Sequence, residues 1–274
     1  MSLFICPVCF EKLERGDRAY TCPSGHCYDI SSEGYVNLLP ANKKHSKLPG
    51  DDKNMVRARN RFLSGGYYEP LRTALVGLVS SISPEQPEIL DSGCGEGYYT
   101  EGIADMLEMS GKSARIAGID ISKEAVRLAA KRKRNAEFAV ASAYHLPLRD
   151  ESADIVINCF SPLCDAEFRR VLREEGCFIY VVPAPRHLWE MKCAVYEKPY
   201  ENERITAEYK GFELREMTTV KDRVMLSGKQ TISDLFTMTP YFWKTPREGL
   251  ARLQALDSLE TEISFDIYVY QKIS

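Results

Sequence analysis

The sequence predicts an α/β fold in two parts: a small N-terminal zinc ribbon, then a Rossmann-like domain with a doubly wound, mostly parallel sheet. Three observations support this prediction. Four metal-ligating side chains crowd the first thirty residues, short β-branched runs alternate with helical segments from about residue 86, and a glycine-rich turn follows the first of those runs.

The composition is that of an ordinary globular protein. The 274 residues include 36 basic and 39 acidic side chains, for a net charge of −3, and 44% are hydrophobic. These values exclude a disordered chain and a uniformly basic, histone-like protein. No run approaches the roughly 20 apolar residues that span a bilayer, and the first residues lack a leader pattern, so we expect a cytoplasmic protein.

The N-terminal cysteines have the spacing of zinc ligands. Cys6 and Cys9 form a C-x2-C knuckle, and Cys22 and His26 offer a second pair after twelve intervening residues. Two such pairs can surround one ion tetrahedrally, and zinc favours this mixture of sulfur and imidazole. Cys27 competes with His26 for the fourth place, and spacing alone does not exclude it; we favour His26, with Cys27 as a neighbouring thiol. Because four protein ligands leave no open position, we expect one structural zinc per chain.

Positive charge is concentrated after the ribbon. Residues 40–72 hold eight basic and three acidic side chains, a local charge of +5 in an acidic protein. Such segregation favours an anionic partner, although a solvated face is the commoner cause. The side chains that we expect to contact RNA are Lys43, Lys44, Lys47, Arg57, Arg59, Arg61, Arg72 and, from a later aromatic segment, Trp243.

Strands and helices alternate along the rest of the chain. We expect strands at residues 88–91, 116–120, 137–141, 154–157 and 178–182. Helical periodicity covers residues 98–110, 122–135 and 166–174, and Ser122 caps the second of these helices. Two further strands, at 212–225 and 263–270, should form a C-terminal antiparallel hairpin. The domains would then be a zinc-binding ribbon at 1–39, a basic linker and helix at 40–80, and a catalytic domain at 81–274 with an insert at 228–259.

The glycine-rich turn is the most informative segment. Asp91 ends the first strand, and Glu96 lies inside the turn formed by Gly93, Gly95 and Gly97. A similar turn holds the pyrophosphate in dinucleotide-binding enzymes. Two acidic side chains here would repel a pyrophosphate and suit a cation instead. S-adenosylmethionine carries a sulfonium and an ammonium but no phosphate, so the sequence favours a methyltransferase over a dehydrogenase.

Other candidate cofactor residues follow the next strands. Asp120 ends the second strand, where a carboxylate can accept both ribose hydroxyls, although capping of the next helix is the alternative. Ser142 and Ala143 follow the third strand, where methyltransferases usually contact the adenine. The segment 158–162 follows the fourth strand, at the place where many base-modifying methyltransferases keep an acceptor-binding loop.

From end to end, the chain resembles the RlmA-type 23S ribosomal RNA guanine-N1 methyltransferases. The resemblance rests on the cysteine and histidine ribbon and on segments 33–40, 49–51, 68–72, 91–100, 185–188 and 238–240. It implies a class I S-adenosylmethionine-dependent domain that methylates N1 of a guanine in the hairpin-35 region of 23S rRNA. It also implies a homodimer whose subunits form an RNA-binding cleft. Members divide between two nearby guanines, and the sequence does not assign this chain to either.

The resemblance further implies that Tyr68, the Glu96-Gly97 turn and His187 line the cofactor site. Combined with the motif, it gives the expected cofactor contacts: Tyr68, Asp91, Gly93, Gly95, Glu96, Gly97, Tyr98, Asp120, Ile121, Ser142, Ala143 and His187.

Methylation at guanine N1 sets a chemical requirement, because N1 carries a proton at neutral pH. His187 is the first candidate to accept that proton, with simple cofactor contact as the alternative. An unstacked base could rest on Tyr68, Phe160, Tyr241 or Trp243, for each of which core packing is the simpler role. Two other functions remain open: a methyltransferase acting on a small metabolite or another RNA, and an RNA-binding protein without activity.

Overall fold

A single eight-stranded sheet forms the centre of the computed structural model, which describes residues 2–40, 50–132, 135–205 and 208–273. The strand order is β10-β11-β9-β8-β5-β6-β7-β4, and the strands from β9 to β4 run parallel. The parallel part contains β5 (Glu88–Ser92), β6 (Arg115–Asp120), β7 (Ala136–Val140), β8 (Ala153–Cys159) and β9 (Leu172–Pro183). These strands match the five apolar runs that the sequence predicts, and the predicted fold class is confirmed.

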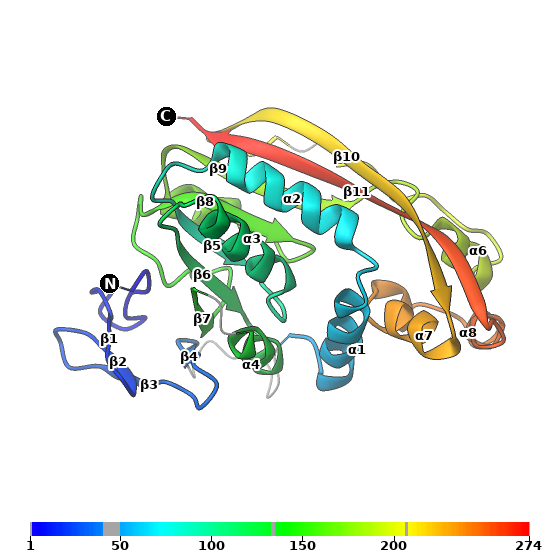
Figure 1. The fold of residues 1–274 in the computed structure, drawn as a ribbon, viewed down its shortest axis with the longest axis horizontal. Helices are drawn as coiled ribbons and strands as arrows, with labels where there is room; N and C mark the ends of the chain where they lie inside the picture. Colours follow the sequence, from blue (N-terminus) through cyan, green and yellow to red (C-terminus); the bar gives the residue numbers. More distant parts are fainter. Residues whose placement is uncertain (1, 41–49, 133–134, 206–207, 274) are drawn as a thin grey trace.

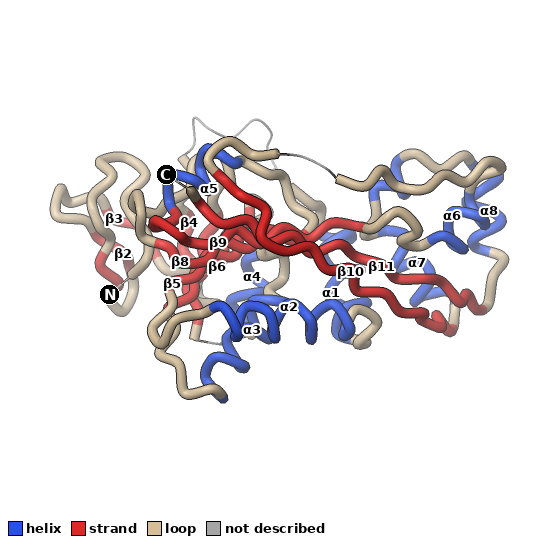
Figure 2. Tube along the Cα trace, turned by 90° about the horizontal axis from the view of Figure 1, so that it is seen from above, coloured by secondary structure: helices blue, strands red, loops and turns tan. Residues whose placement is uncertain are grey.

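Helices cover both faces of the sheet. Figure 2 shows α2 (Glu69–Ile82) and α3 (Tyr98–Met109) on one face and α5 (Asp165–Val171) on the other. The helix α4 (Lys123–Lys131) packs beside β6 and β7, and Ser122 caps it by accepting the amide of Ala125. Covered on both faces, the parallel strands are buried almost throughout, as their continuous apolar runs require.

The zinc ribbon is attached directly to this sheet. It contains β1 (Glu14–Arg15), β2 (Ala19–Thr21) and β3 (Cys27–Asp29), and it leads into β4 (Val36–Asn37). Because β4 pairs in parallel with β7, the ribbon ends as the edge strand of the large sheet. Buried ribbon residues such as Phe4 and Tyr20 share one apolar cluster with Phe168 of α5 and Phe178 of β9. A ribbon too small for its own core therefore uses that of the larger domain.

At the other end, a long antiparallel hairpin extends the sheet. Its strands are β10 (Phe212–Ser227) and β11 (Ser258–Lys272), and Figure 1 shows them side by side, in yellow and red, running from near the C-terminus to the insert. The insert between them forms α7 (Lys229–Thr237), a short 3-10 helix η2 (Pro240–Trp243) and α8 (Arg247–Gln254). The helix α6 (Trp189–Val195) packs against α8 and β11. The predicted hairpin and its insert are thus present.

Three expectations about boundaries need correction. Residues 172–174, expected to end a helix, begin β9 instead, because Leu172 adopts an extended backbone and pairs with Ala153 of β8. The residues expected to form a linker and one helix contain two packed helices, α1 (Lys53–Ser64) and α2, which share the main apolar core. The ribbon expected at 1–39 includes β4, which belongs to the large sheet.

Across the described ranges, no helix combines the length and apolar character needed to cross a lipid bilayer.

Gly97 is a glycine that the fold requires for packing. Its φ is +83°, and a Cβ atom there would lie 2.9 Å from the Cβ of Ala129 on α4. Gly111 has a similar φ of +74° but open space around it.

We expect Gly97→Ala to lower the free energy of unfolding by about 2–4 kcal/mol, against about 1 kcal/mol for Gly111→Ala, because only the first adds a clash to the backbone strain. Urea denaturation of both variants measures the difference. Equal losses would contradict a packing requirement at Gly97.

Candidate functional site

The four predicted metal ligands converge. The ligand atoms of Cys6, Cys9, Cys22 and His26 all lie within 4.8 Å of one another. The Sγ atoms of Cys9 and Cys22 are 3.5 Å apart, and the Sγ of Cys22 is 3.3 Å from Nδ1 of His26. Ligands of a tetrahedral zinc are spaced about 3.3–3.8 Å apart, so this set fits the ion. Cys27 lies exposed on β3 and is not part of the cluster.

The glycine-rich turn joins β5 to α3 against the end of β6. The amides of Gly93 and Cys94 donate to the carbonyl of Ile119, at 2.8 and 2.9 Å. The amide of Gly95 donates to Oδ2 of Asp120 at 3.1 Å. The other oxygen of Asp120, Oδ1, accepts the amide of Ser122 at 2.7 Å. Since a carboxylate oxygen has two lone pairs, Asp120 can hold the turn and still accept ligand hydroxyls.

Three acidic side chains are buried around this turn. The pKa of Asp91 is raised to about 7 by burial and by the charges of Asp120 and Glu96, although Thr100 donates to it at 2.5 Å. Burial likewise raises the pKa of Glu96 and of Asp120. The Oε1 atom of Glu96 has no hydrogen-bond partner among the described residues. Buried carboxylates without counter-charges are costly, and a cationic ligand would relieve that cost.

These acids border a cavity of about 780 Å³, within the range of small-molecule sites. Ten of the twelve predicted cofactor residues line it: Tyr68, Asp91, Gly93, Gly95, Glu96, Asp120, Ile121, Ser142, Ala143 and His187. Gly97 and Tyr98 are absent from the lining. Gly97 instead lies against α4, and the hydroxyl of Tyr98 donates to Glu69 at 2.7 Å, on the side of α2. The side chain of Tyr98 therefore lies outside the cavity lining, and its expected contact with the cofactor stays a prediction.

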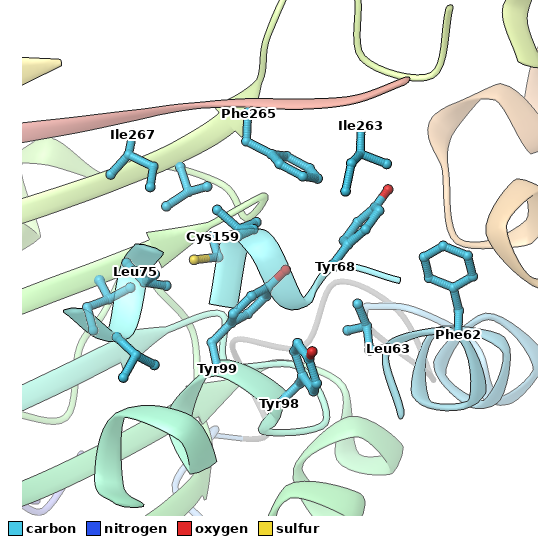
Figure 3. Packing of buried hydrophobic residues seen from close by; sticks show 14 of the residues in the cluster. Phe62, Leu63, Tyr68, Leu75, Tyr98, Tyr99, Cys159, Ile263, Phe265 and Ile267 are labelled. Carbon is cyan, nitrogen blue, oxygen red and sulfur yellow. The ribbon is translucent and has the colours of Figure 1, made fainter. Parts of the chain in front are cut away.

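The neighbouring Tyr99 lines the cavity instead, and the sequence analysis missed it. Its hydroxyl is buried without a hydrogen-bond partner among the described residues. Figure 3 shows Tyr99 and Tyr98 on the same side of the core, with Tyr68 between Phe265 and Leu63. The helical phase of the first turn of α3 decides which tyrosine faces the cavity, and the glycine motif alone does not define that phase.

His187 lies deep in the cavity wall with both ring nitrogens engaged. Its Nδ1 accepts the amide of Ser264 at 3.2 Å, so in the neutral ring the proton is on Nε2. Nε2 lies 3.2 Å from the hydroxyl oxygen of Tyr68 and donates to it. Burial, together with the charge of Lys192, lowers the pKa of His187 to about 3. The geometry therefore argues against the expected role as proton acceptor, because the only basic nitrogen already receives a hydrogen bond.

The cavity lining also includes aromatic side chains. Phe160, Tyr241 and Trp243 line it, and Trp243 is 69% exposed while Phe160 is 43% exposed. Phe160 has a φ of +54°, an uncommon backbone conformation for a phenylalanine. Its loop is held by Ser161, which donates to the carbonyl of Ser92 beside the glycine turn. The cavity is thus lined by buried acids of β5, β6 and the glycine turn, and by aromatic rings from the loop after β8 and from the insert.

The four arginines predicted to bind RNA lie in different environments from one another. Arg61 forms a bidentate ion pair with Asp234 of α7, and Arg72 stacks on Tyr98 and approaches Glu69 and Glu101. Arg59 lines the cavity, and Arg57 is more exposed and lies 3.8 Å from Glu124. These four arginines therefore each have an acidic partner within the protein. Lys43, Lys44 and Lys47 lie outside the described residues.

The fold and cavity define a class I S-adenosylmethionine-dependent methyltransferase, and the cysteine and histidine cluster defines a structural zinc ribbon. Family models agree: residues 4–47 match the RlmA N-terminal zinc ribbon, and residues 85–227 match a methyltransferase domain. A solved structure from Anaeromyxobacter dehalogenans, titled "a Putative Type II Methyltransferase", has a TM-score of 0.51 and 21% identity, covering 73% of this chain and 95% of that one. That likeness supports the fold alone.

Proteins with similar sequences show the family of this chain. A Bacillus subtilis protein named "Putative 23S rRNA (guanine-N(1)-)-methyltransferase" is 32% identical over 99% of this chain and 98% of its own. The 23S rRNA (guanine(748)-N(1))-methyltransferase of Streptomyces fradiae is 36% identical over 68% of this chain and 65% of its own. The chain belongs to the RlmA-type family of 23S rRNA (guanine-N1)-methyltransferases.

For the metal, we expect Cys9→Ser to remove bound zinc and to lower the thermal midpoint by about 5 °C or more, because the ribbon's folding depends on the ion. Cys27→Ser, outside the cluster, serves as the matched control and should keep both the zinc and the midpoint. Elemental analysis and thermal unfolding measure the two effects. Loss of zinc in the Cys27 variant would overturn the ligand assignment.

For the acids, we expect the affinity for S-adenosylmethionine to increase with pH. The cationic ligand favours ionised Asp91, whose pKa of about 7 in the free protein leaves it largely protonated at pH 6. Affinity should therefore fall about three- to ten-fold from pH 8 to pH 6 and level off above pH 8. Calorimetric titration checks this, and Asp91→Asn should have a flatter profile. The same pH slope in both proteins would contradict the assignment.

Proposed function

We propose that this protein transfers a methyl group from S-adenosylmethionine to N1 of one guanine in the hairpin-35 region of 23S rRNA. The observation that carries the proposal is the lining of one cavity, which combines buried acids with exposed aromatic rings. We assign the acids to a cationic cofactor, as the acidic end, and the rings to an unstacked base, as the aromatic end. The name of the Streptomyces fradiae relative, which specifies guanine 748, supports a target in this region of the RNA.

At the acidic end, the proposed cofactor contacts are the predicted residues that line the cavity. Asp120 would accept the ribose hydroxyls, and Ser142 and Ala143, after β7, would border the adenine. Gly93 and Gly95 bring the backbone close to the ligand, and both have positive φ values, of +85° and +55°. Glu96 would accept the ammonium of the cofactor through its unpartnered oxygen.

At the aromatic end, we assign base stacking to Phe160 and Trp243, with Tyr241 as the buried wall behind them. Their exposure differs from that of core aromatics, and both exposed rings border the same cavity. S-adenosylmethionine supplies an electrophilic methyl carbon. The protein's contribution is to hold the guanine edge in line with that carbon and to keep water away.

We assign His187 a positioning role. Its Nε2–H donates to Tyr68, so the hydroxyl proton of Tyr68 is left to point into the cavity as a fixed donor. Burial of both residues, at 5% and 3% exposure, holds this arrangement in place. Tyr68 would then contact the cofactor or the acceptor, while His187 acts through it.

The same proposal covers the assembly of the protein. The chain would consist of three parts: a zinc ribbon, a connecting helical segment and a catalytic domain whose sheet includes β4. We further propose that the chain acts as a homodimer in the cytoplasm, where an rRNA substrate is found. Lys43, Lys44, Lys47 and Trp243 stay the proposed RNA contacts.

The direct test is methyl transfer to protein-free 23S rRNA, read by primer extension, because a methyl group at guanine N1 blocks base pairing. We expect a single new stop within hairpin 35 that requires S-adenosylmethionine. Asp120→Ala should abolish it, and Met109→Ala, at an exposed position of α3 outside the cavity lining, provides the control. Incorporation at another position, or into a small metabolite only, would refute the proposed substrate.

A second prediction concerns His187. If it positions Tyr68, the variants His187→Gln and Tyr68→Phe should each lower kcat about 10-fold, and the double variant should lose little more. The pH–rate profile of His187→Gln should keep the wild-type inflections. Additive losses, or loss of one inflection with the histidine, would restore the role of proton acceptor.

A further inference from the structure

Arg59 differs from the other arginines of its helix. Arg57 and Arg61 are four residues apart and point from one side of α1, toward α4 and α7 respectively. Two residues along an α-helix correspond to a rotation of about 200°, so Arg59 projects from the opposite side. That side faces the cavity, whose lining includes Arg59 and, one helical turn earlier, Met55.

The surroundings of Arg59 are acidic. Its Nη2 atom lies 2.6 Å from Oδ2 of Asp51, and its side chain is 23% exposed. Burial lowers the pKa of Arg59, but the carboxylates of Asp51, Glu96 and Asp120 raise it by more, so the net shift is upward. The guanidinium therefore sits in the field of three acids that border the cavity, and it remains charged.

Asp51 is itself held in place by the cofactor end of the sheet. The carbonyl of Asp51 accepts the hydroxyl of Ser122 at 3.0 Å. The preceding Gly50 has a φ of +82°, and a Cβ there would lie 2.8 Å from Ile121. This close approach brings segment 50–52 over the end of β6, and Asp51 then orients the Arg59 fork toward the cavity.

An RNA phosphate is a poor ligand for this guanidinium. A polyanion would have to approach Asp51, Glu96 and Asp120 at the same time, and their charges oppose it. A zwitterion with one cationic and one anionic group satisfies both charges at once. The unpartnered Oε1 of Glu96, buried beside the cavity, needs a donor such as an ammonium.

We propose that Arg59 binds the α-carboxylate of S-adenosylmethionine while Glu96 binds its α-ammonium, so that the amino-acid end of the cofactor is held between α1 and the glycine turn. Arg59 then pairs with the carboxylate of the cofactor and is not part of the RNA-binding surface. It rests on the proposed function only through the cofactor, because binding to the free protein involves no RNA.

Two adenosine ligands separate this role from a structural one. S-adenosylhomocysteine carries the α-amino acid group, and 5′-methylthioadenosine lacks it. We expect Arg59→Gln to weaken the affinity for S-adenosylhomocysteine about 10- to 100-fold. The affinity for 5′-methylthioadenosine should change less than about two-fold, and calorimetry measures both. Arg59→Lys, which keeps the charge but loses the planar fork, should lie between. Arg57→Gln is the matched control and should leave both affinities unchanged.

Equal weakening of both ligands by Arg59→Lys, or an unchanged affinity for S-adenosylhomocysteine in either variant, would overturn the proposal. Filter binding of a hairpin-35 RNA gives an independent reading. Arg59→Gln should bind this RNA like wild type, and a weaker affinity with a smaller salt dependence would return Arg59 to the RNA surface. If wild type does not bind the RNA at all, the proposed function fails, whereas the contrast between the two ligands still stands.

Discussion

The structure depends on the burial of three carboxylates around one glycine-rich turn. Asp91, Glu96 and Asp120 all have raised pKa values because the fold removes them from water. Backbone amides and Thr100 satisfy part of their hydrogen-bonding capacity, and Arg59 supplies part of the counter-charge. The remaining charge calls for a cationic ligand. A pyrophosphate would make the imbalance worse, which explains why this Rossmann-like turn serves a sulfonium cofactor.

The second constraint is separation along the chain: Tyr241 and Trp243, the aromatic residues that the insert contributes to the cavity, come more than 140 residues after the glycine turn. The hairpin connects the insert to the central sheet, because β11 pairs with β9 and continues past the parallel strands. Arg61 then joins α1 to α7 through Asp234, and α1 also carries Arg59. One helix therefore contacts both the insert and the cofactor end, which couples the two halves of the cavity.

Periodicity and local motifs predicted the five central parallel strands, the zinc ligands and the acids around the glycine turn, and the family resemblance added Tyr68 and His187. The errors arise where a residue's partner is remote. The charge count over residues 40–72 could not reveal Asp234, 173 positions from Arg61, and so treated a structural arginine as a surface one. Likewise, the tautomer of His187 depends on the amide of Ser264, 77 positions away. Tyr98 and Tyr99 differ only in helical phase, which tertiary packing decides.

The central claim is that one cavity holds the cofactor at its acidic end and a guanine at its aromatic end. A crystal structure with S-adenosylhomocysteine and a hairpin-35 RNA tests it most directly. The account predicts the amino-acid group of the cofactor beside Glu96 and Arg59, with an extruded guanine stacked on Phe160 or Trp243 and N1 facing the cofactor sulfur. An adenosine lying among the aromatic rings, with every guanine still stacked in the RNA, would contradict it.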